Sequence, residues 1–340
     1  MDFNYFIFIL IVVTIFPSTL LVNDNLYESY NFNKQNNLNL NFLQNSYAIE
    51  ENDKDDDKGD EEKKDFNNKK DNSIVNFVAV GDFDCNGDAE DTVENIIDQN
   101  PELVLALGDF SYSGSADCWL EMIEPIADKT KIVFGNHEDE DDYMDFFGLT
   151  EEYYSFNYKN MHFLALSTET DYEDDSEQYQ FAVQDLEKYS KDPFIHWIIV
   201  FYHRHVYGSG SLEEDTDFRG IYHPLFDKYK VDLALQGHLH VYERTYPITF
   251  NNEDDDEPTV QDYGHNIYKN PKGPIFLTIG TGGAHKMLLS SLDDFAAEGI
   301  DGEFGIVDIT LESDQKTLTG TFIENGKKKK VTDEFKIIKE

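Results

Sequence analysis

Five short polar motifs each follow an apolar run in this chain. They combine glycine or tyrosine with aspartate, asparagine or histidine, and they are Gly81-Asp82-Phe83-Asp84, Gly108-Asp109-Phe110-Ser111-Tyr112, Gly135-Asn136-His137-Glu138, Tyr202-His203-Arg204-His205 and Gly237-His238-Leu239-His240. Hard cations prefer Asp, Asn and Tyr oxygens, and zinc or iron also accept imidazole nitrogen. Two adjacent ions need about seven or eight such ligands, and ion pairs of this kind suit the hydrolysis of phosphate esters. The set therefore predicts a two-metal site.

The argument depends on the five motifs together, because each alone is typical of ordinary structure. A Gly-Asp pair often caps a loop, a lone Asn often forms a turn, and a lone His is usually a hydrogen-bonded structural residue. His238 and His240 lie two positions apart. In an extended segment such residues face the same side, which suits ligation of two neighbouring ions.

The series of motifs resembles the metal-dependent phosphoesterases of the calcineurin type, and within them it is most similar to the purple acid phosphatases. The resemblance runs from about Val78 to Phe335 and includes an extended match over 237–247 and another over 278–284. It implies an α/β fold, a four-layer α/β/β/α sandwich of two mixed sheets, with the metals at the sheet ends.

The resemblance also implies a ligand set. One ion would be held by Asp82, Asp109, Tyr112 and His240, and the other by Asp109, Asn136, His203 and His238, so that Asp109 bridges. A phenol with a free pKa of about 10 ionises readily only against a strong Lewis acid. Tyr112 as a ligand thus implies Fe(III) paired with Fe, Zn or Mn(II). The alternative is that Tyr112 merely packs, beside a generic Mn or Zn pair.

His137 would lie near the phosphoryl group, as a hydrogen-bond donor or as the general acid for the leaving oxygen. The nucleophile would be a metal-bound hydroxide, without a covalent phosphoenzyme. Relatives often carry a further histidine as a substrate contact, but residues 207–218 contain none. His205 is the candidate to replace it, in a different geometry. Asp84 stands where many relatives have glycine and would add negative charge.

Four other histidines match no ligand position in this family. We expect them to be surface or core residues, and they are His162, His196, His223 and His285.

The elements that position the motifs follow from the apolar periodicity. Strands are predicted at 74–80, 103–107, 132–134, 161–166, 197–201 and 231–235, with helices around 93–97 and at 179–189. This alternation indicates an α/β fold, in which ligand sites lie at the carboxyl ends of strands. A strand meander is predicted at 304–309, 317–322 and 335–338, with Asn325-Gly326 as a turn, and residues 251–262 are predicted as a solvated loop.

The chain before residue 74 has a different character. Residues 5–22 are almost wholly apolar, so segment 1–22 is predicted to be a signal peptide or membrane anchor, although no basic residue precedes it and no A-x-A cleavage site follows. A buried helix is the alternative. Residues 23–73 are Asn-rich and then acidic, which predicts a disordered tether. Residues 74–340 would form the catalytic domain, outside the cell or anchored facing outwards.

Composition narrows the choice of partners. The chain has 69 acidic and 27 basic residues and a formal charge of −42, which argues against a nucleic-acid partner. An anionic substrate also meets long-range repulsion unless metal charge overrides it locally. The cysteines, Cys85 and Cys118, are too few for a cysteine-rich metal site. A disulfide in an exported domain and two buried thiols are both compatible with the sequence.

The function predicted from these observations is an exported metal-dependent phosphatase that acts on a small phosphomonoester. One alternative is a phosphodiesterase or nucleotidase with the same site, because specificity would lie in loops such as 205–220 and 251–270. The other is a surface binding protein with little activity. Loss of a ligand would favour that reading, and no ligand is missing from the motifs.

Overall fold

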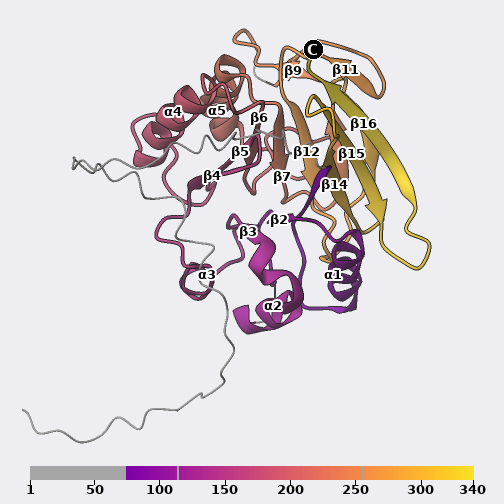
Figure 1. Ribbon diagram of the computed structural model, residues 1–340. Helices are drawn as coiled ribbons and strands as arrows, with labels where there is room; N and C mark the ends of the chain where they lie inside the picture. The colour runs from indigo at the N-terminus through magenta and orange to yellow at the C-terminus, as the bar shows by residue number, and fades with distance from the viewer. Residues whose placement is uncertain (1–73, 113–114, 255) are drawn as a thin grey trace, which may run out of the picture. The chain divides into compact units, whose positions relative to one another are not determined.

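The computed structural model describes residues 74–112, 115–254 and 256–340 (Figure 1). The predicted segments 1–22 and 23–73 lie outside the described residues, so the leader or anchor and the tether stay predictions. Within the described residues, no helix combines the length and the apolar character needed to cross a membrane.

The first of two seven-stranded sheets contains the strands that lead into the first three motifs. Its order is β11-β16-β15-β14-β1-β2-β3. Strands β1, β2 and β3 are parallel, and β14 runs antiparallel to β1, so the sheet is mixed. The antiparallel run β14-β15-β16 confirms the predicted meander. The bounds are β1 (Val75–Val80), β2 (Leu103–Ala106), β3 (Thr130–Ile132), β11 (Ile267–Lys269), β14 (Gly305–Leu311), β15 (Thr317–Glu324) and β16 (Val331–Ile338).

The second sheet carries the histidine motifs. Its order is β13-β8-β12-β7-β6-β5-β4, with parallel pairs in the middle and antiparallel pairs at both edges. The bounds are β4 (Tyr154–Tyr158), β5 (Met161–Ala165), β6 (Trp197–Phe201), β7 (Leu233–Gln236), β8 (Tyr242–Thr245), β12 (Ile275–Ile279) and β13 (Ala296–Ile300). A separate pair joins β9 (Ile248–Thr249) to β10 (Thr259–Val260). The prediction that all of 251–262 is a solvated loop was therefore wrong at its carboxyl end.

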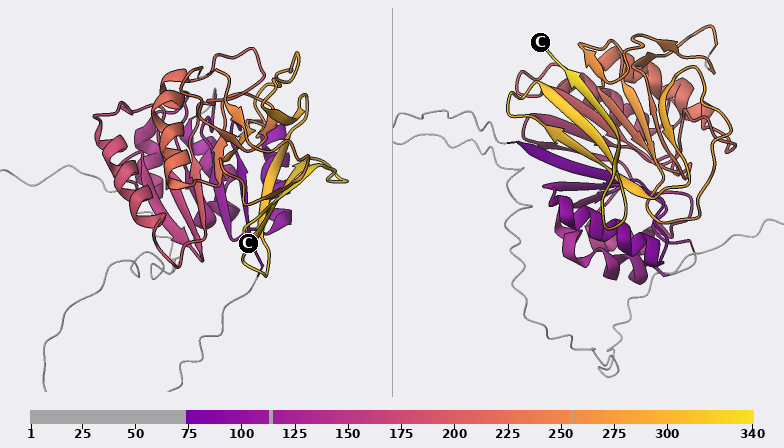
Figure 2. Two further views of the ribbon diagram at one scale, coloured as in Figure 1. Left: turned by 90° about the horizontal axis from the view of Figure 1, so that it is seen from above. Right: turned by 90° about the vertical axis from the view of Figure 1, so that its right-hand side faces the viewer.

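Helices cover the outer faces of both sheets (Figure 2). Their bounds are α1 (Gly87–Gln99), α2 (Ala116–Met122), the 3₁₀ helix η2 (Glu124–Lys129), α3 (Glu140–Phe147), α4 (Glu177–Tyr189) and α5 (Thr216–Tyr229). The Asn86 side chain caps α1 by accepting from the Ala89 N–H, and Asn100 ends it in the left-handed conformation. Asparagine tolerates that conformation better than most residues, so it suits this helix end.

Alternation along β6 explains why the molecule has four layers. Trp197, Ile199 and Phe201 belong to the core cluster shared with the first sheet. Ile198 and Val200 point the other way and pack in a second cluster with side chains of α4 and α5. Successive side chains of a strand face opposite sides of the sheet, so a strand buried on both faces must lie between two layers. The predicted α/β/β/α sandwich is confirmed.

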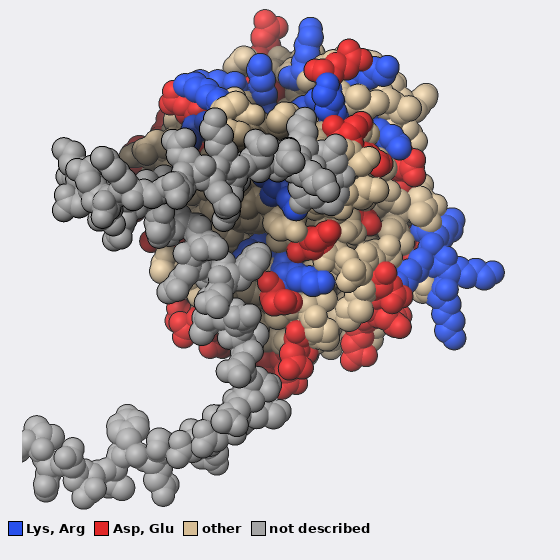
Figure 3. All heavy atoms as spheres, viewed as in Figure 1, with Lys and Arg blue, Asp and Glu red and all other residues tan. Residues whose placement is uncertain are grey.

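Basic side chains project from the turn between β15 and β16. In Figure 3, blue spheres project at the right-hand edge, over the turn between β15 and β16. This turn carries Lys327 to Lys330. Lys329 forms an ion pair with Asp98, and Lys330 pairs with Glu324. The run is thus a turn partly neutralised by neighbouring carboxylates.

Candidate dinuclear metal centre

The two sheets bring the motif residues together at the ends of their strands. The backbone N–H of Asp82 donates to the Gly108 carbonyl oxygen at 2.9 Å, which joins the end of β1 to the end of β2. Across the sandwich, the His238 N–H after β7 donates to Asp82 Oδ2 at 2.8 Å. Loops from both sheets therefore meet around one carboxylate.

Four side chains of the motif set form a cage. The Tyr112 hydroxyl lies 3.0 Å from Asp82 Oδ1, 2.9 Å from Asp109 Oδ2 and 2.8 Å from His240 Nε2. His240 Nε2 also lies 3.2 Å from Asp82 Oδ1. Adjacent ligands of an octahedral ion with bonds of about 2.0–2.1 Å are about 3 Å apart. The spacing of these atoms therefore fits one cation.

Hydrogen bonds among these groups cannot account for the convergence. His240 Nδ1 lies 2.6 Å from the His285 carbonyl oxygen, so Nδ1 is the donor and Nε2 faces the cage with a lone pair. Two carboxylate oxygens and this nitrogen thus surround a hydroxyl that has one proton to donate. Three acceptors around one proton leave electron pairs directed at a common point, which is the arrangement a cation satisfies.

A second set of donors adjoins the first through Asp109. His203 Nε2 lies 3.1 Å from His238 Nδ1 and 3.4 Å from Asp109 Oδ1. These three residues form a group whose ligand atoms lie within 4.8 Å of one another. Asp109 therefore turns Oδ2 towards the Tyr112 cage and Oδ1 towards the histidine pair. One carboxylate that faces two donor sets is what a bridging ligand requires.

Asn136 lies beside the second set, in the turn after β3. The residue before it, Gly135, approaches Asp109 so closely that a Cβ there would lie 2.2 Å from Asp109 Oδ1. Asn136 itself is exposed. The His137 N–H donates to Asp109 Oδ1 at 3.1 Å, so the backbone on both sides of Asn136 lies against Asp109.

Comparison with known proteins agrees with this geometry. A model of the calcineurin-like phosphoesterase family matches residues 75–242. This chain carries a calcineurin-like metallophosphoesterase domain. Purple acid phosphatase 22 of Arabidopsis thaliana is 28% identical over 248 residues, which cover 64% of this chain and 52% of that protein. The probable inactive purple acid phosphatase 27 of the same plant is 30% identical over 251 residues, covering 62% of this chain and 39% of that protein.

The similarity extends to solved structures. The purple acid phosphatase from yellow lupin (Lupinus luteus) seeds superimposes with a TM-score of 0.65 at 25% identity, covering 79% of this chain and 54% of that chain. This chain spans about half the length of the curated relatives it matches. The resemblance to purple acid phosphatases and the predicted fold are confirmed.

Three ligand candidates of the metallophosphoesterase domain take the left-handed backbone conformation. The φ angles are +62° at Asp82, +53° at Asp109 and +67° at His238. A glycine precedes each of the three residues. Among those glycines only Gly108 has a positive φ. Gly237 provides space instead, since a Cβ there would lie 2.8 Å from Asp82 Oδ2. The glycine allows close approach, while the ligand residue carries the strain.

Hydrogen bonds to the backbone orient the imidazoles of this domain. His203 Nδ1 lies 2.8 Å from the Leu107 carbonyl oxygen, which leaves Nε2 directed at the second set. His240 is oriented in the same way by the His285 carbonyl. Such contacts fix the tautomer and ring plane of a metal-binding histidine and raise its basicity.

Burial and charge set the protonation of the site. Burial and the carboxylates of Asp82 and Asp109 raise the pKa of Tyr112 far above its usual range. Burial lowers the pKa of His203, but the charge and hydrogen bond of Asp109 outweigh it and raise this pKa to about 9. A cation held by these residues would reverse both preferences, and its binding would release these protons.

His137 and His205, the two proposed catalytic histidines, have opposite environments. The His137 side chain is 44% exposed, its Nε2 lies 4.0 Å from Asp109 Oδ2, and its ring lies 4.5 Å from that of Tyr112. His205 is fully buried, and neither ring nitrogen makes a hydrogen bond of normal geometry within the described residues. Burial and the neighbouring His238 lower its pKa to about 3. A buried neutral ring does not fit the substrate contact that we predicted for His205.

The remaining unassigned histidines are surface or core residues, as expected. His162 is buried with its Nε2 2.6 Å from Asp185, His223 is buried against Tyr207, and His196 and His285 are exposed.

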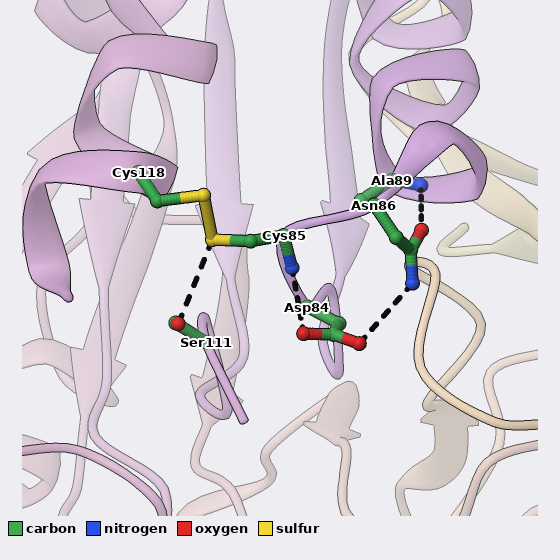
Figure 4. Close-up of a disulfide and its surroundings, with 6 residues drawn as sticks. All are labelled: Asp84, Cys85, Asn86, Ala89, Ser111 and Cys118. Atoms are coloured by element: carbon green, nitrogen blue, oxygen red, sulfur yellow. Dashed lines mark hydrogen bonds between the residues drawn. A yellow bond between two sulfur atoms is a disulfide. The ribbon is translucent and has the colours of Figure 1, made fainter. Parts of the chain in front are cut away.

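Cys85 and Cys118 form a disulfide, which joins the loop after β1 to α2 (Figure 4). The adjacent Asp84 turns back on its own loop. Its carboxylate accepts from the Cys85 N–H at 2.7 Å and from Asn86 Nδ2 at 3.2 Å. Asp84 is thus engaged in shaping this loop, which places part of its charge against local donors.

Glu138 contributes to the site in a way that the motif did not reveal. Its carboxylate accepts from the backbone N–H groups of Phe110 at 2.7 Å, Asp109 at 3.0 Å and Gly135 at 2.6 Å. It thereby clamps the ends of β2 and β3 together under the bridging residue.

Arg219 ties together two loops that we expected to govern specificity. Its buried guanidinium donates to the Val206 carbonyl oxygen at 2.9 Å and forms ion pairs with Glu214 and Asp256. Glu214 Oε1 in turn accepts from the Gly208 N–H at 2.9 Å. Arg219 therefore joins Val206 and Glu214 of the first loop to Asp256 of the second. Arg219 lies in α5, a helix that was not predicted from the sequence.

Proposed function

We propose that this chain is a metal-dependent phosphomonoesterase with a dinuclear site. The observation that carries the proposal is the orientation of Asp109, whose two carboxylate oxygens face two different donor sets. Asp82, Tyr112 and His240 would complete the first set. Asn136, His203 and His238 would complete the second. The purple acid phosphatase relatives support the same reaction class.

The donor set favours a trivalent ion beside a divalent one. Two carboxylates and a phenolate would place three negative charges around the pair. A phenolate ligand suits ferric iron, so we infer Fe(III) with Fe, Zn or Mn(II) as the second ion. Two such cations supply an activated water and neutralise charge on the phosphoryl oxygens. Their excess positive charge would also overcome the repulsion between an anionic ester and this acidic chain.

The protein groups then orient the substrate. His137 is the exposed histidine over Asp109 and Tyr112, so its N–H can donate to the phosphoryl group. Arg219 also holds the backbone of Val206, which follows His203 of the histidine pair by three residues. The buried contacts of Tyr112, His203 and His240 hold the donors in place before substrate arrives, which reduces the reorganisation needed during reaction.

Export is the setting that fits the disulfide and the acidic composition. Disulfides persist in oxidising compartments, and the chain joins its two cysteines. We therefore propose an enzyme that acts outside the cell, secreted or anchored through residues 5–22, on small organic phosphate esters.

The test is hydrolysis of p-nitrophenyl phosphate by the full chain, produced with iron, zinc and manganese available. Asp109→Asn is compared with the wild type and with Asp91→Asn, a change at an exposed position of α1. We expect the bridging variant to lose at least about a hundredfold in kcat, more than loss of a supporting contact costs, while the control keeps wild-type activity. Metal content is measured for all three.

Each alternative has its own outcome. Turnover of bis-p-nitrophenyl phosphate without turnover of the monoester would favour the diesterase reading. Bound metals with no turnover of either ester would favour a binding protein. Equal activity in the wild type and in Asp109→Asn would refute the proposal that Asp109 bridges a dinuclear site.

A further inference from the structure

The motifs supply one exposed histidine on the substrate side of the candidate site, and a second one is missing from them. Residues 207–218 contain no histidine, and His205 is buried. Among the motif histidines, this leaves His137 as the exposed imidazole at the Tyr112 cage. Hydrolysis of an ester with a poor leaving group needs a donor at the leaving oxygen as well as contacts to the phosphoryl oxygens.

His285, which matched no family position, lies at this cage. Its carbonyl oxygen accepts from His240 Nδ1 at 2.6 Å, and its ring centroid lies 4.5 Å from that of His240. The residue is exposed. His137 contacts the Tyr112 ring and His285 contacts the His240 ring, while Tyr112 and His240 touch each other at 2.8 Å. Each of the two exposed imidazoles therefore packs on the ring of one cage residue, His137 on Tyr112 and His285 on His240.

The position of His285 is fixed by the backbone of the site rather than by its own side chain. The Gly282 N–H donates to the Gly81 carbonyl oxygen at 2.9 Å, and the Ala284 N–H donates to the Asp82 carbonyl oxygen at 2.9 Å. A Cβ on Gly282 would lie 2.5 Å from the Gly81 oxygen, so the loop after β12 lies directly on the Gly81-Asp82 backbone. The Met287 N–H also donates to the His240 carbonyl oxygen at 3.3 Å.

Two exposed leucines, Leu288 and Leu292, follow His285 in the chain. Leu288 is 72% exposed and Leu292 is 44% exposed. Leu292 packs on Gly299, and the Leu289 N–H donates to Asp301 Oδ2 at 2.7 Å. The chain leaving His285 thus exposes these two leucines together with Lys286, whose ammonium lies over the Phe304 ring.

We propose that His285 is a second substrate-contacting residue, which donates a ring N–H to the ester oxygen of the leaving alcohol while His137 contacts the phosphoryl group. This inference rests on the proposed phosphomonoesterase function. Cleavage of the P–O bond leaves the electron pair on the alcohol oxygen. A donor there stabilises this charge, and it matters most when the alcohol is a weak acid.

The test compares two substrates in the full, metal-loaded protein. p-Nitrophenyl phosphate releases a stable phenolate, whereas glycerol 2-phosphate releases a poor alkoxide. For His285→Ala we expect kcat to fall about a hundredfold with the glycerol ester and less than about tenfold with the nitrophenyl ester. His285→Gln retains an N–H donor and is expected to recover part of the loss. All variants keep the backbone carbonyl that orients His240, so metal content should not change.

His196→Ala is the matched control, because His196 is also exposed and lies before the start of β6 while the site lies beyond its end. We expect wild-type rates with both esters. Equal losses with both esters in His285→Ala, no loss with either, or loss of bound metal would each overturn the proposal for His285. Failure of the wild type to hydrolyse either monoester would instead refute the proposed function, so the two failures are distinguishable.

Discussion

Glu138→Gln tests whether the metal centre depends on a residue that binds no metal. The carboxylate of Glu138 holds three backbone N–H groups, and those of Asp109 and Gly135 share Oε2 while that of Phe110 faces Oε1. An amide has one acceptor oxygen. If that oxygen accepts from the N–H groups of Asp109 and Gly135, the NH₂ group of the glutamine lies against the Phe110 N–H. Two hydrogen-bond donors then face each other, and neither has an acceptor.

The expected cost follows from these three bonds. A hydrogen bond to a charged group contributes about 1.5–3 kcal/mol, and an unpaired buried donor adds a comparable penalty. One bond is lost and the other two lose their charge, so we expect the free energy of unfolding to fall by about 2–4 kcal/mol. Because the clamp positions Asp109, the affinity for metal should fall about 10–100-fold, as for other residues that support ligands.

The assay measures denaturant unfolding of the metal-stripped full chain and, separately, metal binding by competition with a chelator. Glu187→Gln is the control, since Glu187 is exposed on α4 and pairs only with the neighbouring turn through Lys191. The control should leave both quantities unchanged. Wild-type metal affinity in Glu138→Gln would refute the reasoning that this clamp positions the bridging carboxylate, even if stability fell.

Two further predictions concern stability away from the ligands. Burial raises the pKa of Asp308 to about 6 despite a hydrogen bond from Asn76, so the folded state binds a proton that the unfolded state releases from about pH 4 upwards. The loss of this proton destabilises the folded state above about pH 6 and has no effect below pH 4. Asp308→Asn cannot lose a proton there, so its free energy of unfolding should exceed that of the wild type at pH 7.5. The difference should disappear near pH 4 in unfolding curves. The Cys85–Cys118 disulfide closes a separation of 33 residues, and replacing both cysteines by serine should lower the free energy of unfolding by about 3–4 kcal/mol. Identical melting under oxidising and reducing conditions would contradict this second prediction.

Periodicity located most of the strands that lead into the site. The predicted strand at 197–201 coincides with β6, and 103–107 extends β2 by one residue. The signal was strong because these strands are buried on both faces and read as continuous apolar runs. The strand predicted at 132–134 lies two residues late, since β3 spans Thr130–Ile132. Its first residues are Thr and Lys, so its polar start concealed the boundary.

Contacts that depend on the third dimension were not predictable from motifs. The helix α5 was missed because it contains Pro224 and Gly220, which usually mark loops. The burial of His205 and the exposure of His285 could not be ranked, since both are lone histidines in loops. A carboxylate that accepts backbone N–H groups, such as Glu138, looks in sequence like any acidic loop residue.

Strain at the ligand residues explains why the motifs were nevertheless so informative. A non-glycine residue in the left-handed region costs about 1–2 kcal/mol, and Asp82, Asp109 and His238 all take that conformation. Contacts that do not involve a cation hold these residues in place. The Asp82 backbone N–H donates to the Gly108 carbonyl oxygen, and the His238 N–H donates to Asp82 Oδ2.

Glycine is needed at positions 108 and 237, which precede two of these residues, because a Cβ there would collide with the side chains of His203 and Asp82. The glycine before Asn136 meets the same limit. A Cβ on Gly135 would reach Asp109 Oδ1, and one on Gly108 would lie 2.6 Å from His203 Nδ1. The Gly-Asp and Gly-His pairs therefore record two requirements at once, namely close approach by the first residue and a strained turn by the second.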